Sequence, residues 1–178
     1  MAVIKIVTIP NQILTTPAKK VVVFDNETRT LISDLLDTAR EAKNPEAAGL
    51  AAPQIGISRR VCVVREFFVN PSNKDKLVAK DYVLVNPKII SASKEKELDI
   101  EACLSVPNVY GMVERAKKVK VKAQDGDGNE IRLTASGFLA RVVQHEIDHL
   151  DGILFTSKLV GKSYTEEELE KIESGVRY

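Results

Sequence analysis

The chain has 178 residues, of which 44% are hydrophobic and 29% are charged, and its formal net charge is +1. This length and composition are typical of one globular domain, and the charge gives no overall attraction to nucleic acid or anionic membranes. No apolar run approaches the roughly 20 residues of a membrane span. We therefore expect a single domain over residues 1–178 that binds neither DNA nor a membrane.

The beginning of the chain, residues 1–6, lacks the basic region, apolar stretch and cleavage site of a secretory signal. We expect a cytoplasmic protein, most simply a monomer. A reducing compartment disfavours a disulfide between the two cysteines, Cys62 and Cys103. Because Cys62 lies within a short apolar run, we expect it to be a small buried hydrophobe.

The first predicted elements are a strand and a helix. Residues 3–9 resemble a short strand. Apolar residues recur at helical spacing over residues 27–43 and predict an amphipathic helix. Asp25 or Asn26 can cap its beginning, and Asn44-Pro45 is expected to end it.

The middle of the chain has β-type patterns. The small residues 47–54 are predicted to form a loop rather than a helix. Residues 61–64 and 82–86 are predicted to form apolar strands, with a loop at residues 70–73 between them.

A polar hairpin is predicted over residues 118–133. Lysines alternate with Val or Ala in residues 118–123, and a glycine-rich turn over residues 125–129 precedes a second alternating run. On an alternating strand we interpret the lysines as a solvated face rather than as a nucleic-acid site.

Two more helices are predicted. Residues 137–150 form the first, with Ser136 as N-cap and Gly152 as a stop. The last begins at about residue 165, where Thr165 and Glu168 fit a capping box. The fold class expected is α+β, with small antiparallel or mixed sheets packed around a central helix that carries an H-E-x-x-H motif.

The two histidines of the chain are the strongest functional signal. His145 and His149 are four residues apart, with Glu146 directly after the first. On a helix both imidazoles share one face and can reach one metal ion. Glu146 can then contact water at that metal without binding the ion, which is the arrangement of metal-assisted hydrolysis.

The third ligand is less evident, because a catalytic metal usually has three protein ligands and an open position. In the metzincin pattern a third histidine follows, but Phe155 stands in that place. A downstream glutamate of a general zinc peptidase is an alternative, and the candidates lie in an acidic, solvated segment: Glu166, Glu167, Glu168 and Glu170. Upstream candidates are acids and Cys103.

Three short motifs in fixed order resemble the peptide deformylase family. The family motifs are Gly-x-Gly-Leu-Ala-Ala-x-Gln, Glu-Gly-Cys-Leu-Ser and Gln-His-Glu-x-Asp-His. This chain has Ala47-Ala48-Gly49-Leu50-Ala51-Ala52-Pro53-Gln54, then Glu101-Ala102-Cys103-Leu104-Ser105, then Gln144 to His149. Each motif alone is weak evidence, but three at this spacing across the chain are specific.

The resemblance implies that Cys103, as thiolate, binds one divalent metal together with His145 and His149. Iron(II) is the first expectation, and zinc, nickel or cobalt also suit these ligands. Glu146 would accept the proton of the attacking water and pass it to the leaving amine. The side-chain amide of Gln54 and the backbone N–H of Leu104 would stabilise the oxyanion.

The implied substrate is the N-formyl group on the initiator methionine of a nascent polypeptide, and docking on ribosomes is left open. The peptide would lie as an added strand against the main chain of Ala48, Gly49 and Ala102. Phe138 and Val142, with His145, would line the pocket for the methionine side chain. Glu101 and Arg115 are expected to form an ion pair behind the site, and Arg141 to pair with an acid.

Two positions depart from the family motifs, since Ala47 and Ala102 stand where the family has glycine. Their methyl groups could narrow the cleft, and they put substrate preference in question more than reaction type. They keep open a formamide hydrolase with another substrate. Two further rival functions are a general zinc peptidase and a non-catalytic protein that binds peptide ends.

Overall fold

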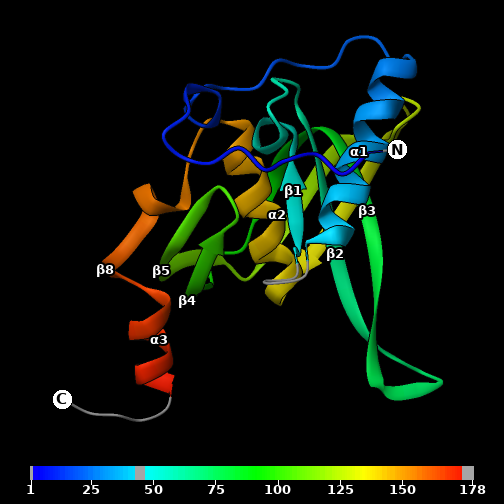
Figure 1. Cartoon of the computed structure of the whole chain (residues 1–178). Coiled ribbons are helices and arrows are strands. Elements are labelled where there is room, and N and C mark those ends of the chain that lie inside the picture. Colours follow the sequence, from blue (N-terminus) through cyan, green and yellow to red (C-terminus); the bar gives the residue numbers. More distant parts are fainter. Residues whose placement is uncertain (1, 43–46, 174–178) are drawn as a thin grey trace.

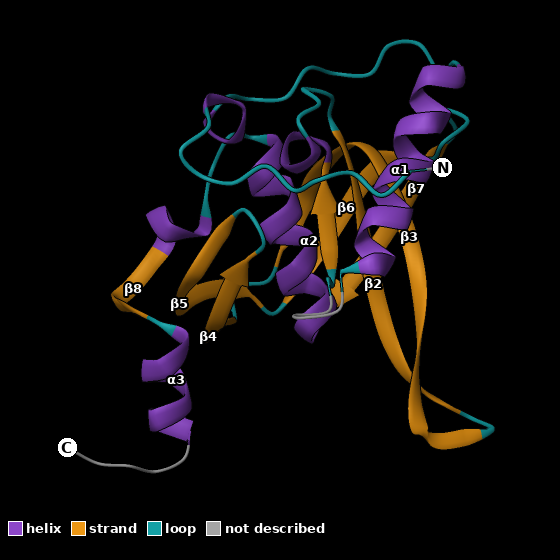
Figure 2. Ribbon diagram, viewed as in Figure 1, coloured by secondary structure: helices purple, strands orange, loops and turns teal. Residues whose placement is uncertain are grey.

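The computed structural model describes residues 2–42 and 47–173. The strands lie around one helix near the centre (Figures 1 and 2). The helices are α1 (Asn26–Glu41), α2 (Gly137–Leu150) and α3 (Glu166–Glu173), and the short 3-10 helices are η1 (Gln12–Thr15), η2 (Ala52–Ile55) and η3 (Phe155–Lys158). The strands are β1 (Gly49–Ala51), β2 (Val61–Asn70), β3 (Asn73–Ala92), β4 (Lys96–Cys103), β5 (Val106–Ala116), β6 (Lys118–Gln124), β7 (Glu130–Ser136) and β8 (Leu159–Tyr164).

Two small sheets flank α2. A five-stranded sheet has the order β1-β2-β3-β6-β7, and a three-stranded sheet has the order β4-β5-β8. Every pairing between these strands is antiparallel. The predicted α+β class is therefore confirmed, with antiparallel rather than mixed sheets.

The core on which the site rests lies between α2 and the five-stranded sheet. From α2, Ala140, Val143, Ile147 and Leu150 are buried in one cluster with apolar residues of β2, β6 and β7. The residues repeat three or four positions apart, so they form the continuous apolar stripe of a packed helix. The opposite side of α2 is left to face the three-stranded sheet.

The helix α1 covers the other face of the five-stranded sheet, where its apolar residues pack with those of β1 and β2. The Asp25 side chain accepts a hydrogen bond from the Thr28 N–H, so Asp25 is the N-cap, as predicted. The expected stop at Asn44-Pro45 lies outside the described residues. None of the described helices is long and apolar enough to cross a membrane.

The polar hairpin is confirmed as β6 and β7. Lys118, Lys120 and Lys122 are exposed while the residues between them are buried. The helix predicted over residues 137–150 is α2, although the Ser136 side chain at its N-cap position makes no capping hydrogen bond. In the C-terminal segment, Thr165 and Glu168 form the predicted capping box at the start of α3.

Two predictions of secondary structure were wrong. Residues 3–9 are extended but form no strand, because they pair with no neighbouring strand: the N–H of Val7 donates to the carbonyl of Gln54 in η2, and that of Ile9 to the carbonyl of Ser105 in the turn after β4. Residues 47–54 are not a simple loop, since they contain β1 and η2. Small residues suit this segment because the cleft described below needs backbone close to α2.

Glycine substitutions test how tightly the C-terminal end of α2 packs. Gly152 has a φ of +72°, and a Cβ there would lie 2.8 Å from the carbonyl carbon of Thr16. Gly161 has a φ of +87° but open space around it. We expect Gly161→Ala to cost about 1 kcal/mol of stability through strain alone. Gly152→Ala should cost at least about 2 kcal/mol more, because backbone must move.

Urea unfolding of both variants measures this difference. Equal losses of stability would contradict the close approach of residues 15–16 to Gly152.

Candidate active site

The face of α2 toward the three-stranded sheet presents the residues of the H-E-x-x-H motif. The rings of His145 and His149 lie one turn apart, with centroids 4.9 Å apart and an interplanar angle of 74°. Because residues four apart share a face, both rings point to the same space above the helix.

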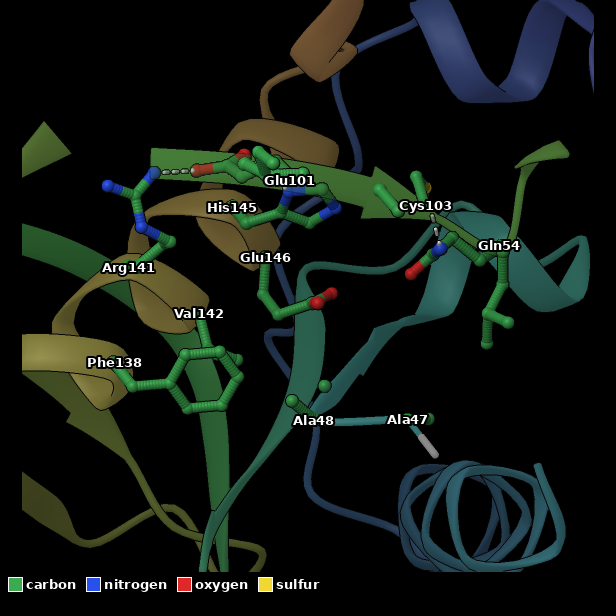
Figure 3. A pocket seen from close by; sticks show the side chains of 14 residues that line it. Ala47, Ala48, Gln54, Glu101, Cys103, Phe138, Arg141, Val142, His145 and Glu146 are labelled. Atoms are coloured by element: carbon green, nitrogen blue, oxygen red, sulfur yellow. Dashed lines mark hydrogen bonds and ion pairs between the residues drawn. The ribbon is translucent and has the colours of Figure 1, made fainter. Parts of the chain in front are cut away.

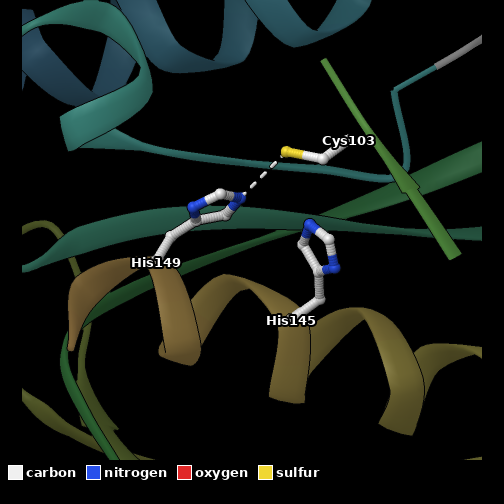
Figure 4. Close-up of side chains that lie close together, drawn as sticks. All are labelled: Cys103, His145 and His149. Carbon is white, nitrogen blue, oxygen red and sulfur yellow. Dashed lines mark hydrogen bonds between the residues drawn. The ribbon is translucent and has the colours of Figure 1, made fainter. Parts of the chain in front are cut away.

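Cys103 is the last residue of β4, and its side chain lies beside the two histidines (Figure 4). Its Sγ lies 3.2 Å from Nε2 of His149. One donor atom from each of Cys103, His145 and His149 lies within 4.8 Å of the others. Among the described residues, this is the group of cysteine, histidine or acidic side chains whose donor atoms lie close enough together to bind one metal ion.

Glu101 fixes the orientation of His145. Its Oε2 lies 3.0 Å from Nδ1 of His145. Burial alone would raise the pKa of Glu101, but hydrogen bonds from Arg115 and His145 hold it well below the usual range. An ionised carboxylate only accepts, so Nδ1 of His145 carries a hydrogen and donates it to Glu101.

Two arginines compensate the buried charge of Glu101. Arg115 donates to both carboxylate oxygens of Glu101, each at 2.9 Å, and also pairs with Asp148. Arg141 donates to Oε1 of Glu101 at 2.8 Å and to the Val113 carbonyl. The expected Glu101–Arg115 pair is thus present, and the acid partner of Arg141 is the same Glu101. On its other side, Asp148 accepts a hydrogen bond from Lys158.

The electrostatic surroundings of the two histidines differ. Burial lowers the pKa of His149 well below its usual range, and the positive charges of His145 and Arg115 lower it further. Burial also opposes a charge on His145, yet its hydrogen bonds to Cys103 and Glu101 raise its pKa to about 10. The two ligand candidates therefore differ: positive charge is favoured on His145 and disfavoured on His149.

This donor set fits a divalent transition-metal ion. Two imidazole nitrogens and one thiolate are ligands that such ions accept, and three protein ligands leave a position open for chemistry. Nδ1 of His149 is buried without a protein partner in the described structure, so the protein fixes the tautomer of His145 alone.

Glu146 lies beside the donors and faces β1 (Figure 3). A Cβ at Gly49 would lie 2.5 Å from Oε1 of Glu146, so glycine is needed at this close approach. Burial raises the pKa of Glu146 to about 7. Its Oε2 has no hydrogen-bond partner among the described residues, which leaves it available to a small molecule.

Gln54 approaches the same space from η2. Its Oε1 accepts a hydrogen bond from the Ala51 N–H at 2.8 Å, which orients the amide. Its Nε2 is then directed at Sγ of Cys103, at 3.6 Å, and at Oγ of Ser105, at 3.3 Å. Leu104 follows Cys103 in the turn to β5 and lines the same cleft.

The cleft beside these residues has a volume of about 210 Å³. One wall is formed by Ala47, Ala48, Gly49 and Gln54, and another by Ile100, Glu101, Ala102, Cys103 and Leu104. The floor comes from α2, through Phe138, Arg141, Val142, His145 and Glu146. Every site residue predicted from the sequence lines this cleft, apart from His149, which lies behind it.

The two departures from the glycine motifs have different surroundings. Ala47 lines the cleft but is buried and packs with apolar residues of α1. Ala102 is exposed on β4, where its methyl group is accessible at the cleft wall.

Three residues near the site were missed or misplaced by sequence patterns. Ile100 carries no signal that distinguishes it from an ordinary strand residue, and Ser105 ends the second motif but was given no role. Phe155, which stands at the third-histidine place of metzincins, is buried and stacks on the His145 ring at a centroid distance of 6.1 Å.

Comparisons with known proteins agree on one family. Residues 3–164 match the family model described as Polypeptide deformylase. The chain is 50% identical over 173 residues to peptide deformylase 1 of Bacillus subtilis, covering 97% of this chain and 99% of the relative. It is 45% identical to the peptide deformylase of Caldicellulosiruptor bescii, covering 98% and 95%.

Solved structures of deformylases have the same fold. One is the class I type b peptide deformylase from Acinetobacter baumannii with Met-Ala-Ser bound, with a TM-score of 0.77 and 38% identity, covering 89% of this chain and 99% of that one. Another is a peptide deformylase from Synechococcus elongatus in complex with actinonin, with a TM-score of 0.77 and 35% identity, covering 98% and 87%.

The two buried cysteines give a matched test of the metal site. Cys103 lies with the histidines, whereas Cys62 lies in the core of β2. We expect Cys103→Ala to weaken metal binding more than about 100-fold, since even loss of a residue that supports a ligand costs 10–100-fold. Cys62→Ala should keep its metal. The metal content of each folded variant is measured after dialysis. If both variants kept the metal, the result would contradict this ligand set.

Proposed function

The chain belongs to the polypeptide deformylase family, and we propose that Cys103, His145 and His149 hold the metal ion with which it works. As a member, it is a metal-dependent hydrolase that removes the N-formyl group from the initiator methionine of new polypeptides and releases formate. The observation that supports the proposed site is the convergence of these three donors beside Glu146 and Gln54 at one cleft.

We propose iron(II) as the metal, with zinc, nickel or cobalt as ions that the same ligands accept. A divalent ion at this site would act as a Lewis acid and would make hydroxide available from water near neutral pH. The protein contributes the orientation of the ligands, above all through the hydrogen bond between Glu101 and His145.

Glu146 is proposed as the group that moves the proton. Water attacks the formyl carbon, and the bond between that carbon and the methionine nitrogen breaks. The proton lost by the water passes to Glu146 and then to the departing nitrogen, so the products are formate and a free α-amine. The buried position of Glu146 and its unpartnered Oε2 suit this task.

Gln54 and Leu104 are proposed to stabilise the negative charge that develops on the formyl oxygen. The Gln54 amide is held by its bond to Ala51 before substrate arrives, so its N–H donors need little reorganisation. The backbone N–H of Leu104 would donate from the turn after Cys103.

The rest of the substrate would lie in the cleft between β1 and β4. Main-chain groups of Ala48, Gly49 and Ala102 would bind its backbone as an added strand. Phe138 and Val142 would contact the methionine side chain. The A. baumannii relative holds Met-Ala-Ser, the peptide that remains when formyl-Met-Ala-Ser is deformylated, which supports this choice of substrate.

The nascent polypeptide is the partner, and we propose that the protein meets it as a monomer in the cytoplasm. The rival zinc peptidase would need a downstream acid ligand. The described candidates Glu166, Glu167, Glu168 and Glu170 lie on the mostly exposed α3 rather than with the three donors.

Replacement of Glu146 tests the proton-transfer role. We expect Glu146→Gln to keep its metal but to release formate from formyl-Met-Ala-Ser at least about 100-fold more slowly, since the amide cannot accept the water proton. A surface control, Glu170→Gln, should behave as wild type. Near-normal turnover by Glu146→Gln would remove Glu146 from the mechanism.

Replacement of Gln54 tests the oxyanion role. Gln54→Ala should lower kcat by about 100-fold with little change in KM, because the lost hydrogen bond strengthens only in the transition state. The exposed Gln12→Ala is the matched control. A rise in KM at unchanged kcat would instead assign Gln54 to ground-state binding.

A further inference from the structure

The hairpin formed by β2 and β3 extends beyond the rest of the five-stranded sheet (Figures 1 and 2). The two strands pair along their length, from Val61 opposite Val85 to Asn70 opposite Asn73. On the outer edges, β1 pairs with β2 only as far as Val64, and β6 pairs with β3 only from Val85 onward. Within the described chain, the outer part of the hairpin is therefore a ribbon of two strands.

This ribbon exposes four large apolar side chains. Phe68 is opposite Val78 on one face, with 44% and 41% of their surfaces exposed, and Val69 is opposite Leu77 on the other, with 56% and 63% exposed. A two-stranded hairpin is marginally stable in water, and clustered apolar exposure is a mark of a binding surface.

The hairpin points in the direction in which a peptide would leave the cleft. From Cys103 and Gln54, the cleft continues along β1 past Gly49 toward Ala48. Since β2 is antiparallel to β1, with Cys62 opposite Ala51 and Val64 opposite Gly49, the same direction along β2 leads to Phe68. At about 3.3 Å per residue, Phe68 lies roughly 13 Å beyond Val64.

We propose that the apolar end of the β2–β3 hairpin binds the substrate polypeptide downstream of its formyl-methionine. This inference rests on the proposed function, because it needs the formyl end to lie beside Cys103. About three residues of an extended chain fill the cleft, and about four more span the roughly 13 Å to Phe68. The hairpin would then contact residues at about positions five to eight, and apolar side chains there would bind best.

A second copy of this chain is a weaker candidate for the occupant. The four side chains expose a few hundred Å² at most, well below the roughly 800 Å² per partner of a stable interface. A small apolar surface gives weak binding with little sequence preference, which suits a polypeptide that must be released after each reaction.

Three substrates and two variants test the proposal. The substrates are formyl-Met-Ala-Ser, a formylated peptide of about ten residues with leucines at positions five to eight, and the same peptide with serines there. The hairpin variant combines Phe68→Thr, Val69→Thr, Leu77→Thr and Val78→Thr, since threonine keeps β propensity. The control combines Val22→Thr and Val23→Thr, which are also exposed valines but lie far from the hairpin in the chain.

In the wild type and the control, we expect the KM of the leucine peptide to be about 5–10-fold lower than that of the serine peptide. The kcat values should be equal, because a contact far from the formyl group stabilises the bound substrate and the transition state to the same extent. The hairpin variant should lose this difference and keep its turnover of formyl-Met-Ala-Ser. Equal KM values in the wild type, or an unchanged difference in the hairpin variant, would overturn the proposal.

Turnover of formyl-Met-Ala-Ser separates the other causes of failure. If the fourfold variant turns it over poorly, the pair Val69→Thr and Leu77→Thr is compared in its place. If the wild type releases no formate from any peptide, the proposed function fails. Peptide binding by the hairpin is then measured separately, by fluorescence anisotropy of a labelled leucine peptide that lacks the formyl group. The wild type should bind this peptide about 5–10-fold more tightly than the hairpin variant does.

Discussion

The buried carboxylate of Glu101 is the group on which the site depends. It joins β4 to β5 through Arg115 and to α2 through Arg141 and His145. A charge this deep is unfavourable without partners, and removal of one partner of a buried pair typically costs 3–5 kcal/mol. The two arginines compensate the charge, so the same contacts that hold the sheet against the helix also set the tautomer of a metal ligand.

Two buried carboxylates in one cleft have opposite surroundings. Every oxygen of Glu101 accepts hydrogen bonds from cations, so it stays ionised. Glu146 has an oxygen without a partner, and burial raises its pKa to about 7. Their surroundings thus move the pKa values of the two acids apart. This difference assigns a structural role to Glu101 and proton transfer to Glu146.

Local patterns predicted the helices well, because the apolar stripe of α2 and the cap at Asp25 are properties of neighbouring residues. The ligand set could be predicted only with the family motifs, since Cys103 is 46 residues from His149 and no periodicity connects them. The long β2–β3 hairpin and the three-stranded sheet were not recognised. Their strands owe their pairing to tertiary contacts, which local propensity does not encode.

The hydrogen bonds from the N-terminal segment have a consequence for the order of assembly. Val7 and Ile9 reach Gln54 and Ser105, and Cys103 in turn meets His149, so the cleft joins residues from both ends of the described chain. Contacts of such long sequence separation form late and slowly. During its own synthesis the protein therefore gains its cleft only after α2 has left the ribosome.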